Sequence, residues 1–176
     1  MKLEFDRVTI ASDETHHLLD NKPLYSKRFL NVLSFHPPGI AAVLDETGAY
    51  HIGLDGNPIY DCRYTHTFGF YNNRAAVAKN NDWFHILSTG KHLYKESYSW
   101  CGNFQNGACT VRNHLGYYFH IDLNGNPLYS QKYTYAGDFR DSIAVIQNED
   151  GFYTHIYHSG KYVHNKWFHR QLKGLA

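Results

Sequence analysis

The sequence predicts an all-β protein built from a unit of about 35 residues that occurs five times, and three observations support this fold class. Five histidines recur at spacings of 35, 34, 35 and 35 residues: His16, His51, His85, His120 and His155. Five residues after each of them stands a Gly or an Asn, as expected of a repeated turn. The chain also holds 15 Tyr, 11 Phe and 3 Trp, and aromatic residues favour β-strands.

Each unit is expected to end in a β-hairpin whose turn carries the Gly or Asn. Asp55-Gly56 and Asn124-Gly125 lie between β-rich runs, and such pairs favour two-residue type I′ turns, because both central residues need positive φ. Both faces of these hairpins are largely apolar or aromatic, so we expect neighbouring units to cover them on both sides. Counting outward from the turns places each histidine opposite a Tyr or a His: His16 with Tyr25, His51 with Tyr60, His85 with Tyr94, His120 with Tyr129, and His155 with His164.

No linker divides the chain, so we expect a single β-repeat domain over residues 1–176. Residues 1–25 hold an incomplete unit with a strand near residues 5–11 and the His16 hairpin. In each complete unit an aromatic segment and a short strand of the Ala75-Ala76-Val77 type precede the hairpin, which gives at least three strands. The complete units are residues 26–60, 61–94, 95–129 and 130–164, and residues 165–176 begin one more.

The two ends of the chain indicate how the repeats close. Residues 165–176 supply the first part of a unit and residues 1–25 supply the last part, so together they make about one unit. This favours a small five-bladed β-propeller closed by pairing of the N- and C-terminal segments. The alternative is an open β-repeat array in which each unit contacts only its neighbours, because 35 residues are few beside the roughly 40–45 of a four-stranded blade.

Composition narrows the partners and the cellular location. The formal net charge is +1 with charges of both signs interspersed, which predicts neither a nucleic-acid partner nor a membrane surface. The N-terminal residues are charged and lack the apolar stretch of a signal peptide, so we expect a cytoplasmic protein. Three cysteines without metal-binding spacing, Cys62, Cys101 and Cys109, are expected to be reduced thiols.

Two segments of the fourth unit resemble the bacterial WG-type repeat. They are Gly116-Tyr117-Tyr118-Phe119-His120-Ile121 and Phe104-Gln105-Asn106-Gly107-Ala108-Cys109-Thr110-Val111. The likeness covers most of the chain, although Phe or Thr replaces the second Gly of the family pattern and His replaces the aromatic residue that follows it. The resemblance implies a β-repeat module with a binding or scaffolding role and carries over no catalytic residue. It also leaves open that the chain is an accessory module of a larger bacterial enzyme.

The repeated histidines have two interpretations. If they surrounded a common axis they could bind a metal or an anion, since neutral imidazole is a common ligand. The favoured interpretation is structural: each His hydrogen-bonds the residue opposite it and the pair packs between units, because buried polar groups need partners. Repetition in every unit is what a structural role predicts.

A second candidate site consists of polar and aromatic residues near the expected turns. An aromatic platform with a few placed polar groups suits a sugar or a peptide. The candidates are Trp100, Asn103, Asn113, His114, Arg140 and Asp141, with Asp61, Arg63 and His66 in the preceding unit.

No catalytic motif is present: we find no G-x-S-x-G, P-loop, H-E-x-x-H or C-x-x-C pattern. The sequence therefore predicts a non-enzymatic module, without a cofactor, that binds a protein partner or a small ligand such as a sugar. The alternative is a metal- or anion-binding site formed by the repeated histidines.

Overall fold

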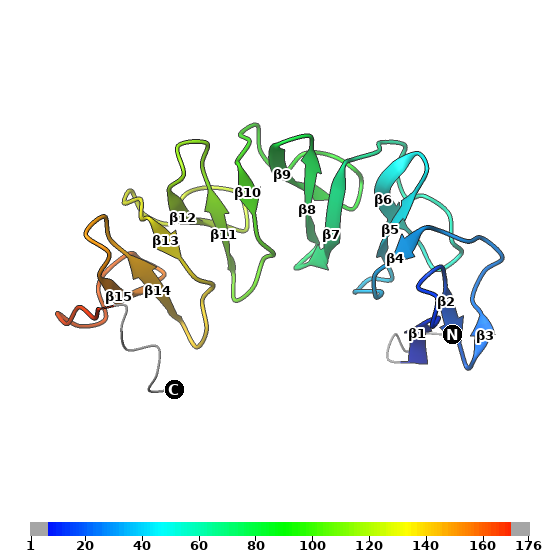
Figure 1. The fold of residues 1–176 in the computed structure, drawn as a ribbon, viewed down its shortest axis with the longest axis horizontal. Helices are drawn as coiled ribbons and strands as arrows, with labels where there is room; N and C mark the ends of the chain where they lie inside the picture. Colours follow the sequence, from blue (N-terminus) through cyan, green and yellow to red (C-terminus); the bar gives the residue numbers. More distant parts are fainter. Residues whose placement is uncertain (1–6, 170–176) are drawn as a thin grey trace. The chain divides into compact units, whose positions relative to one another are not determined.

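The computed structural model describes residues 7–169, which fold into antiparallel β-sheets and contain no α-helix (Figure 1). Nothing within these residues could serve as a membrane-spanning helix. The strands form five three-stranded sheets in chain order. Their bounds are β1 (Val8–Ile10), β2 (His17–Leu19), β3 (Lys22–Pro23), β4 (Asn31–Val32), β5 (Ala41–Asp45), β6 (Gly48–Ile52), β7 (His66–Tyr71), β8 (Arg74–Lys79), β9 (Asp82–Leu87), β10 (Trp100–Cys101), β11 (Ala108–Arg112), β12 (Tyr118–Asp122), β13 (Tyr135–Ala136), β14 (Ile143–Gln147) and β15 (Tyr153–Tyr157).

The predicted all-β fold with five repeated units is confirmed. The chain divides into two compact units, Met1–Lys95 and Glu96–Ala176. The first unit holds the sheets β1–β3, β4–β6 and β7–β9, and the second holds β10–β12 and β13–β15. The predicted pairing of the N- and C-terminal segments involves residues 1–6 and 170–176, which lie outside the described residues.

In the second, third and fourth sheets the middle strand is buried on both faces over three or four consecutive residues, which explains the absence of a regular alternation in the sequence there. In β8 the four consecutive residues Ala75, Ala76, Val77 and Ala78 are all buried. Small and β-branched side chains at these positions let neighbouring sheets approach closely. The β4–β6 core cluster includes Phe35, Tyr50 and Ile52, and Tyr25 from the preceding hairpin packs into it.

The loops of the repeated hairpins differ from the prediction in four of five copies. In the fourth copy Gly125 N–H donates to the Asp122 carbonyl, and Asp122 N–H donates to the Asn126 carbonyl. The loop therefore has three residues, and only its last one, Gly125, has positive φ, at 87°. Equivalent bonds form at Gly56, Gly90 and Gly160. The prediction of two-residue turns was wrong there because a glycine at the third position favours a three-residue hairpin loop.

The first hairpin does have the two-residue turn. Asp20 and Asn21 have φ values of 51° and 63°, and Leu19 pairs directly with Lys22. This hairpin is therefore one residue shorter than the others. The consequence is a shift of one position in the first copy: the residue equivalent to His51 and His120 is His17, and the prediction of His16 was wrong.

Candidate functional site

The repeated histidines join each hairpin to the next sheet. His120 Nδ1 lies 2.6 Å from the Tyr129 hydroxyl, and its Nε2 lies 2.7 Å from the Gly137 carbonyl oxygen of the next sheet. His17 makes the same contacts to Tyr25 at 2.5 Å and to the Leu33 carbonyl at 2.8 Å. His51 contacts the Tyr60 hydroxyl and, at 2.7 Å, the Phe68 carbonyl. We call this arrangement the histidine latch.

The latch fixes the protonation state of the imidazole. A carbonyl oxygen only accepts, so Nε2 carries the proton and donates, and Nδ1 accepts from the tyrosine hydroxyl. Burial lowers the pKa of His51 to about 4 and also lowers the pKa of His17 and of His120. Burial raises the pKa of Tyr25 to about 12. The latch histidines are therefore neutral at pH 7, with both ring nitrogens engaged.

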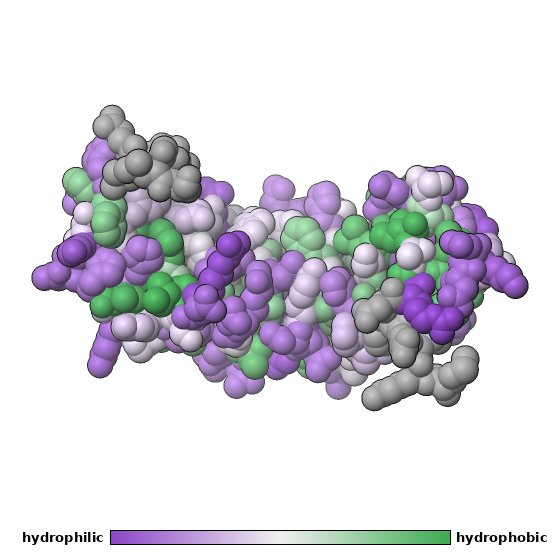
Figure 2. Space-filling model, turned by 90° about the horizontal axis from the view of Figure 1, so that it is seen from below, coloured by the Kyte–Doolittle hydropathy of each residue, from purple (hydrophilic) through white to green (hydrophobic). Residues whose placement is uncertain are grey.

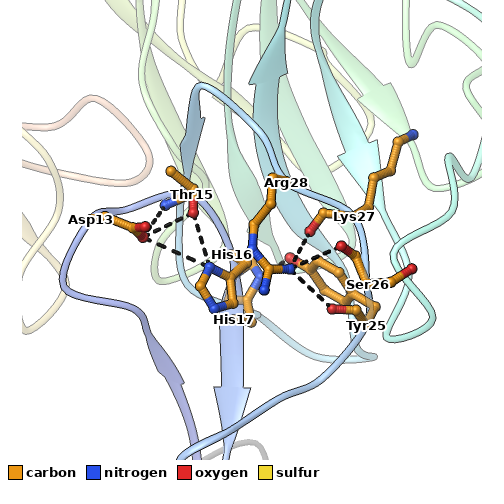
Figure 3. Close-up of polar contacts among 8 residues, drawn as sticks. All are labelled: Asp13, Thr15, His16, His17, Tyr25, Ser26, Lys27 and Arg28. Carbon is orange, nitrogen blue, oxygen red and sulfur yellow. Dashed lines mark hydrogen bonds and ion pairs between the residues drawn. The ribbon is translucent and has the colours of Figure 1, made fainter.

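His16, the predicted member of the first copy, occupies a different place. Its Nδ1 lies 2.9 Å from Thr15 Oγ1 and 3.7 Å from Asp13 Oδ1 (Figure 3). It precedes the latch histidine, at the position that Tyr50 and Phe119 hold in other copies. Arg28, after the first hairpin, donates to the carbonyls of Ser26 and Lys27 (Figure 3).

The other two predicted pairs lie close together as well. His85 Nδ1 is 2.6 Å from the Tyr94 hydroxyl, and His155 Nδ1 is 3.0 Å from His164 Nε2. Among residues 7–169 no group of three or more His, Cys, Asp and Glu side chains is placed to hold a metal ion. The geometry of the latch therefore supports a structural role better than a ligand ring.

The predicted loop residues do not converge on one site. Asn113 Oδ1 accepts the N–H groups of Leu115 and Tyr117 and so shapes its own turn. His114 lies 3.4 Å from Ser97 Oγ. Arg140 and Asp141 belong to the β13–β14 turn, where Asp141 has φ 48°. Asn103 is half-buried next to β10. Trp100 lines a pocket of about 420 Å³ in the second unit, and Arg140 lines another.

In the first unit two of the three further candidates have aromatic neighbours. The Arg63 guanidinium lies 3.7 Å from the centre of the Tyr50 ring, and His66 stacks on Trp83. Asp61 accepts a hydrogen bond from Arg63 through its backbone carbonyl, not its side chain.

Two rows of side chains cross the sheets of the second unit. Trp100 pairs with Arg112, which pairs with Tyr118. Residues directly opposite on antiparallel strands share a face, so Arg112 is flanked by two aromatic rings. We call these three residues the fourth-sheet row. Tyr135, Gln147 and Tyr153 are paired in the same way and form the fifth-sheet row.

The two rows meet at a cavity of about 420 Å³, which we call the β10–β13 groove. The whole fourth-sheet row lines it, opposite Tyr135, Gly137 and Asp138 of the next sheet. The rings of Tyr118 and Tyr135 are 5.9 Å apart between centroids. Trp100 and Tyr135 are 36% and 43% exposed. The face of the protein shown in Figure 2 is mainly hydrophilic, with separate hydrophobic patches.

Two glycines leave room for the exposed rings. A Cβ atom on Gly102 would lie 3.0 Å from Trp100 Cη2, and one on Gly137 would lie 3.3 Å from Tyr135 Oη. Each ring therefore lies against a backbone position, directly after a strand, that has no side chain.

The charged groups of the groove are placed at opposite ends. The Arg112 guanidinium is 5.7 Å from the centre of the Tyr118 ring. The Asp138 carboxylate accepts hydrogen bonds from Thr110 Oγ1 at 2.8 Å and from Gln105 Nε2 at 3.0 Å. Sequence reasoning did not select Arg112, Tyr135 or Asp138, because their proximity depends on strand register and on contact between sheets. The signal that was available is the repeated spacing, since Trp100 and Tyr135 each lie two residues after a buried Tyr.

Three solved structures are similar to the chain in fold. They are the computationally designed Ika8 protein (TM-score 0.55, 14% identity, 89% of this chain and 57% of that one), BamB from Moraxella catarrhalis (0.55, 9%, 92% and 61%) and Hsv2 from Kluyvelomyces marxianus (0.55, 14%, 84% and 51%). The chain spans 51 to 61% of their lengths. BamB and Hsv2 are propeller-like, so the likeness supports a propeller-like β-repeat fold.

The sequence comparisons give one positive result. No curated protein matches the chain, whereas the WG containing repeat matches residues 52–83 and 120–152. Each matched segment starts in the last strand of one sheet and ends at the beginning of the last strand of the next. The predicted resemblance is confirmed: one segment in each compact unit is similar to the WG containing repeat.

Proposed function

We propose that the protein is a non-enzymatic binding module whose β10–β13 groove holds a carbohydrate. The observation that carries this proposal is the pair of exposed rings, Trp100 and Tyr135, resting on glycines beside Arg112 and Asp138. Sugars present C–H faces that pack on aromatic rings and hydroxyl groups that hydrogen-bond to charged and polar side chains.

The size of the groove favours a small ligand. A cavity of about 420 Å³ lies within the usual range for small-molecule sites. A stable protein partner would instead cover about 800 Å² of this chain. A concave site with three aromatic rings therefore fits a sugar better than a protein surface.

The polar groups of the groove support binding without catalysis. Ser99 Oγ donates to the carbonyls of Arg112 and Asn113, at 3.1 and 2.9 Å, so no base is placed to activate it. Asp138 is the one carboxylate lining the groove, and it already accepts two hydrogen bonds. The predictions of a cytoplasmic location and of no nucleic-acid or membrane partner rest on the sequence alone.

The test is a screen of soluble oligosaccharides against the wild-type protein, followed by titration of the best ligand into Trp100→Ala. Loss of a central aromatic platform is expected to weaken binding about 30-fold, as for hot-spot tryptophans in interfaces. Trp83→Ala, which removes the tryptophan of the corresponding row of the first unit, where Trp83 holds the place of Tyr118, is the control and should bind as the wild type does. Failure of every oligosaccharide to bind, or full binding by Trp100→Ala, would contradict the proposal.

A further inference from the structure

We propose that the carbohydrate is an acidic oligosaccharide and that Arg112 binds the carboxylate of a hexuronic acid residue. This inference rests on the proposed function and names the ligand class. It follows from the different charges at the centres of the two rows and at the two ends of the groove.

Arg112 is suited to a carboxylate from the ligand. It is the last residue of β11, it is exposed, and no carboxylate of residues 7–169 forms an ion pair with it. The centre of the Tyr118 ring lies 5.7 Å from the guanidinium. A guanidinium offers two parallel N–H groups that match the two oxygens of a carboxylate.

Asp138 gives the groove a direction. Its carboxylate is held by Thr110 Oγ1, and Thr110 lies two residues before Arg112 on the same face of β11, about 7 Å away along the strand. One end of the groove therefore offers donors and a positive charge, and the other offers acceptors and a negative charge. A ligand with a carboxylate at one end and hydroxyl or amide N–H groups at the other complements both ends.

The fifth-sheet row extends the site to a second sugar. Its central residue is Gln147, whose amide nitrogen donates to the Gly151 carbonyl at 3.2 Å and whose amide oxygen lies 3.3 Å from Thr134 Oγ1. This row thus offers the rings of Tyr135 and Tyr153, 6.4 Å apart between centroids, around a neutral group. Because Tyr118 and Tyr135 bring the rows together, a chain that alternates acidic and neutral sugars can contact both.

The test compares two probes that differ only in charge. One is a hexasaccharide alternating glucuronic acid and N-acetylglucosamine, and the other is the same compound with its carboxylates reduced to alcohols. Both are titrated calorimetrically at low salt into the wild type, Arg112→Gln and Lys79→Gln. Arg112→Gln gives the fourth-sheet row the same central residue as the fifth, and Lys79→Gln removes one charge from an exposed position of the first unit.

The wild type and Lys79→Gln should prefer the acidic probe by about fivefold, the upper range for an exposed ion pair. Arg112→Gln should lose this preference and bind the acidic probe no more tightly than it binds the reduced probe. Equal binding of both probes by the wild type, or an undiminished preference in Arg112→Gln, would overturn the acidic ligand and leave the carbohydrate proposal intact. Failure of both probes, together with a negative oligosaccharide screen, would overturn the proposed function itself.

Discussion

The two compact units contain equivalent grooves that differ in what fills them. The first unit has a cavity of about 240 Å³ lined by residues of β4–β6 and by His66, Thr67 and Phe68. The second has the β10–β13 groove of about 420 Å³. In the first, Leu33 and Phe68 stand four residues after Phe29 and Tyr64, whereas in the second, Gly102 and Gly137 stand four residues after Tyr98 and Tyr133. One position of the repeat therefore decides whether a side chain fills the groove.

The rows that cross the sheets show the same contrast. In the second sheet Asn31, Leu44 and Ala49 are paired across the strands, and in the third His66, Ala78 and Trp83. Their central residues are apolar, whereas Arg112 and Gln147 are polar. A shared scaffold thus carries a groove with an apolar residue at the centre of its row in one unit and a groove with Arg112 at that place in the other. The latch and the groove therefore vary independently.

The largest effect is expected from removal of the latch, which both units share. His51→Ala and His120→Ala each leave a buried tyrosine hydroxyl and a backbone carbonyl without a partner, at about 1–3 kcal/mol per group. Each variant should lose about 4 kcal/mol of unfolding free energy, measured by urea denaturation. If only one of the two variants lost stability, the latch would not contribute equally to the stability of the two units.

The first copy offers a matched control for the latch. His17→Ala should destabilise the protein as His51→Ala does, because His17 also contacts a tyrosine hydroxyl and a backbone carbonyl of the next sheet. His16→Ala should change the unfolding free energy by less than about 1 kcal/mol, since its hydrogen bond to Thr15 is only partly buried. The reverse order would contradict the one-residue shift in this hairpin.

The next effect concerns the position that distinguishes the grooves. Gly137→Phe places in the second unit the residue that Phe68 supplies in the first, and a Cβ atom at this position would lie 3.3 Å from Tyr135 Oη. Filling a preformed site should weaken oligosaccharide binding about 100-fold. Circular dichroism should confirm that the variant is folded, and binding at wild-type strength would rule out the β10–β13 groove as the site.

Acid should weaken both units through the latch. The pKa of His51 is lowered by burial from 6.5 to about 4 in the folded protein, and burial also lowers the pKa of His120. Between these values the unfolded chain binds more protons than the folded one, so stability is full above about pH 6.5 and falls as the pH drops towards 4. Urea unfolding at pH 7.5, 6, 5 and 4.5 measures this, and stability independent of pH in this window would contradict neutral latch histidines.

The smallest effect is expected at the centre of the fifth-sheet row. Gln147→Ala removes one polar group that a neutral sugar could contact, which is expected to weaken oligosaccharide binding about fivefold. Ala78 holds the equivalent place in the first unit. The double variant Trp100→Ala/Ala78→Gln is then titrated calorimetrically with the oligosaccharide. It should not bind at the groove of the first unit, because the Phe68 side chain still lines that groove.

The sequence was sufficient for the repeat and insufficient for the groove, for physical reasons. The period and the Gly-containing turns are local signals, so the five sheets could be predicted. The length of the loop at Gly56 or Gly125 could not be predicted from the dipeptide alone. Because the first hairpin has a loop one residue shorter, its latch histidine is His17 and not the predicted His16. Arg112 and Tyr135 lie in different sheets, and their meeting depends on register and on the glycines between them.

The most direct test of the account uses the three tryptophans. Trp83 belongs to the row of the third sheet, Trp100 lines the β10–β13 groove, and Trp167 belongs to neither. The indole N–H signals are followed by two-dimensional ¹H–¹⁵N NMR during an oligosaccharide titration, with assignments from Trp→Phe variants. The account predicts that the Trp100 signal shifts with ligand while the Trp83 and Trp167 signals stay in place. A shift at Trp83 with Trp100 unchanged would show that the ligand binds elsewhere and would contradict the assignment of the site to the second unit.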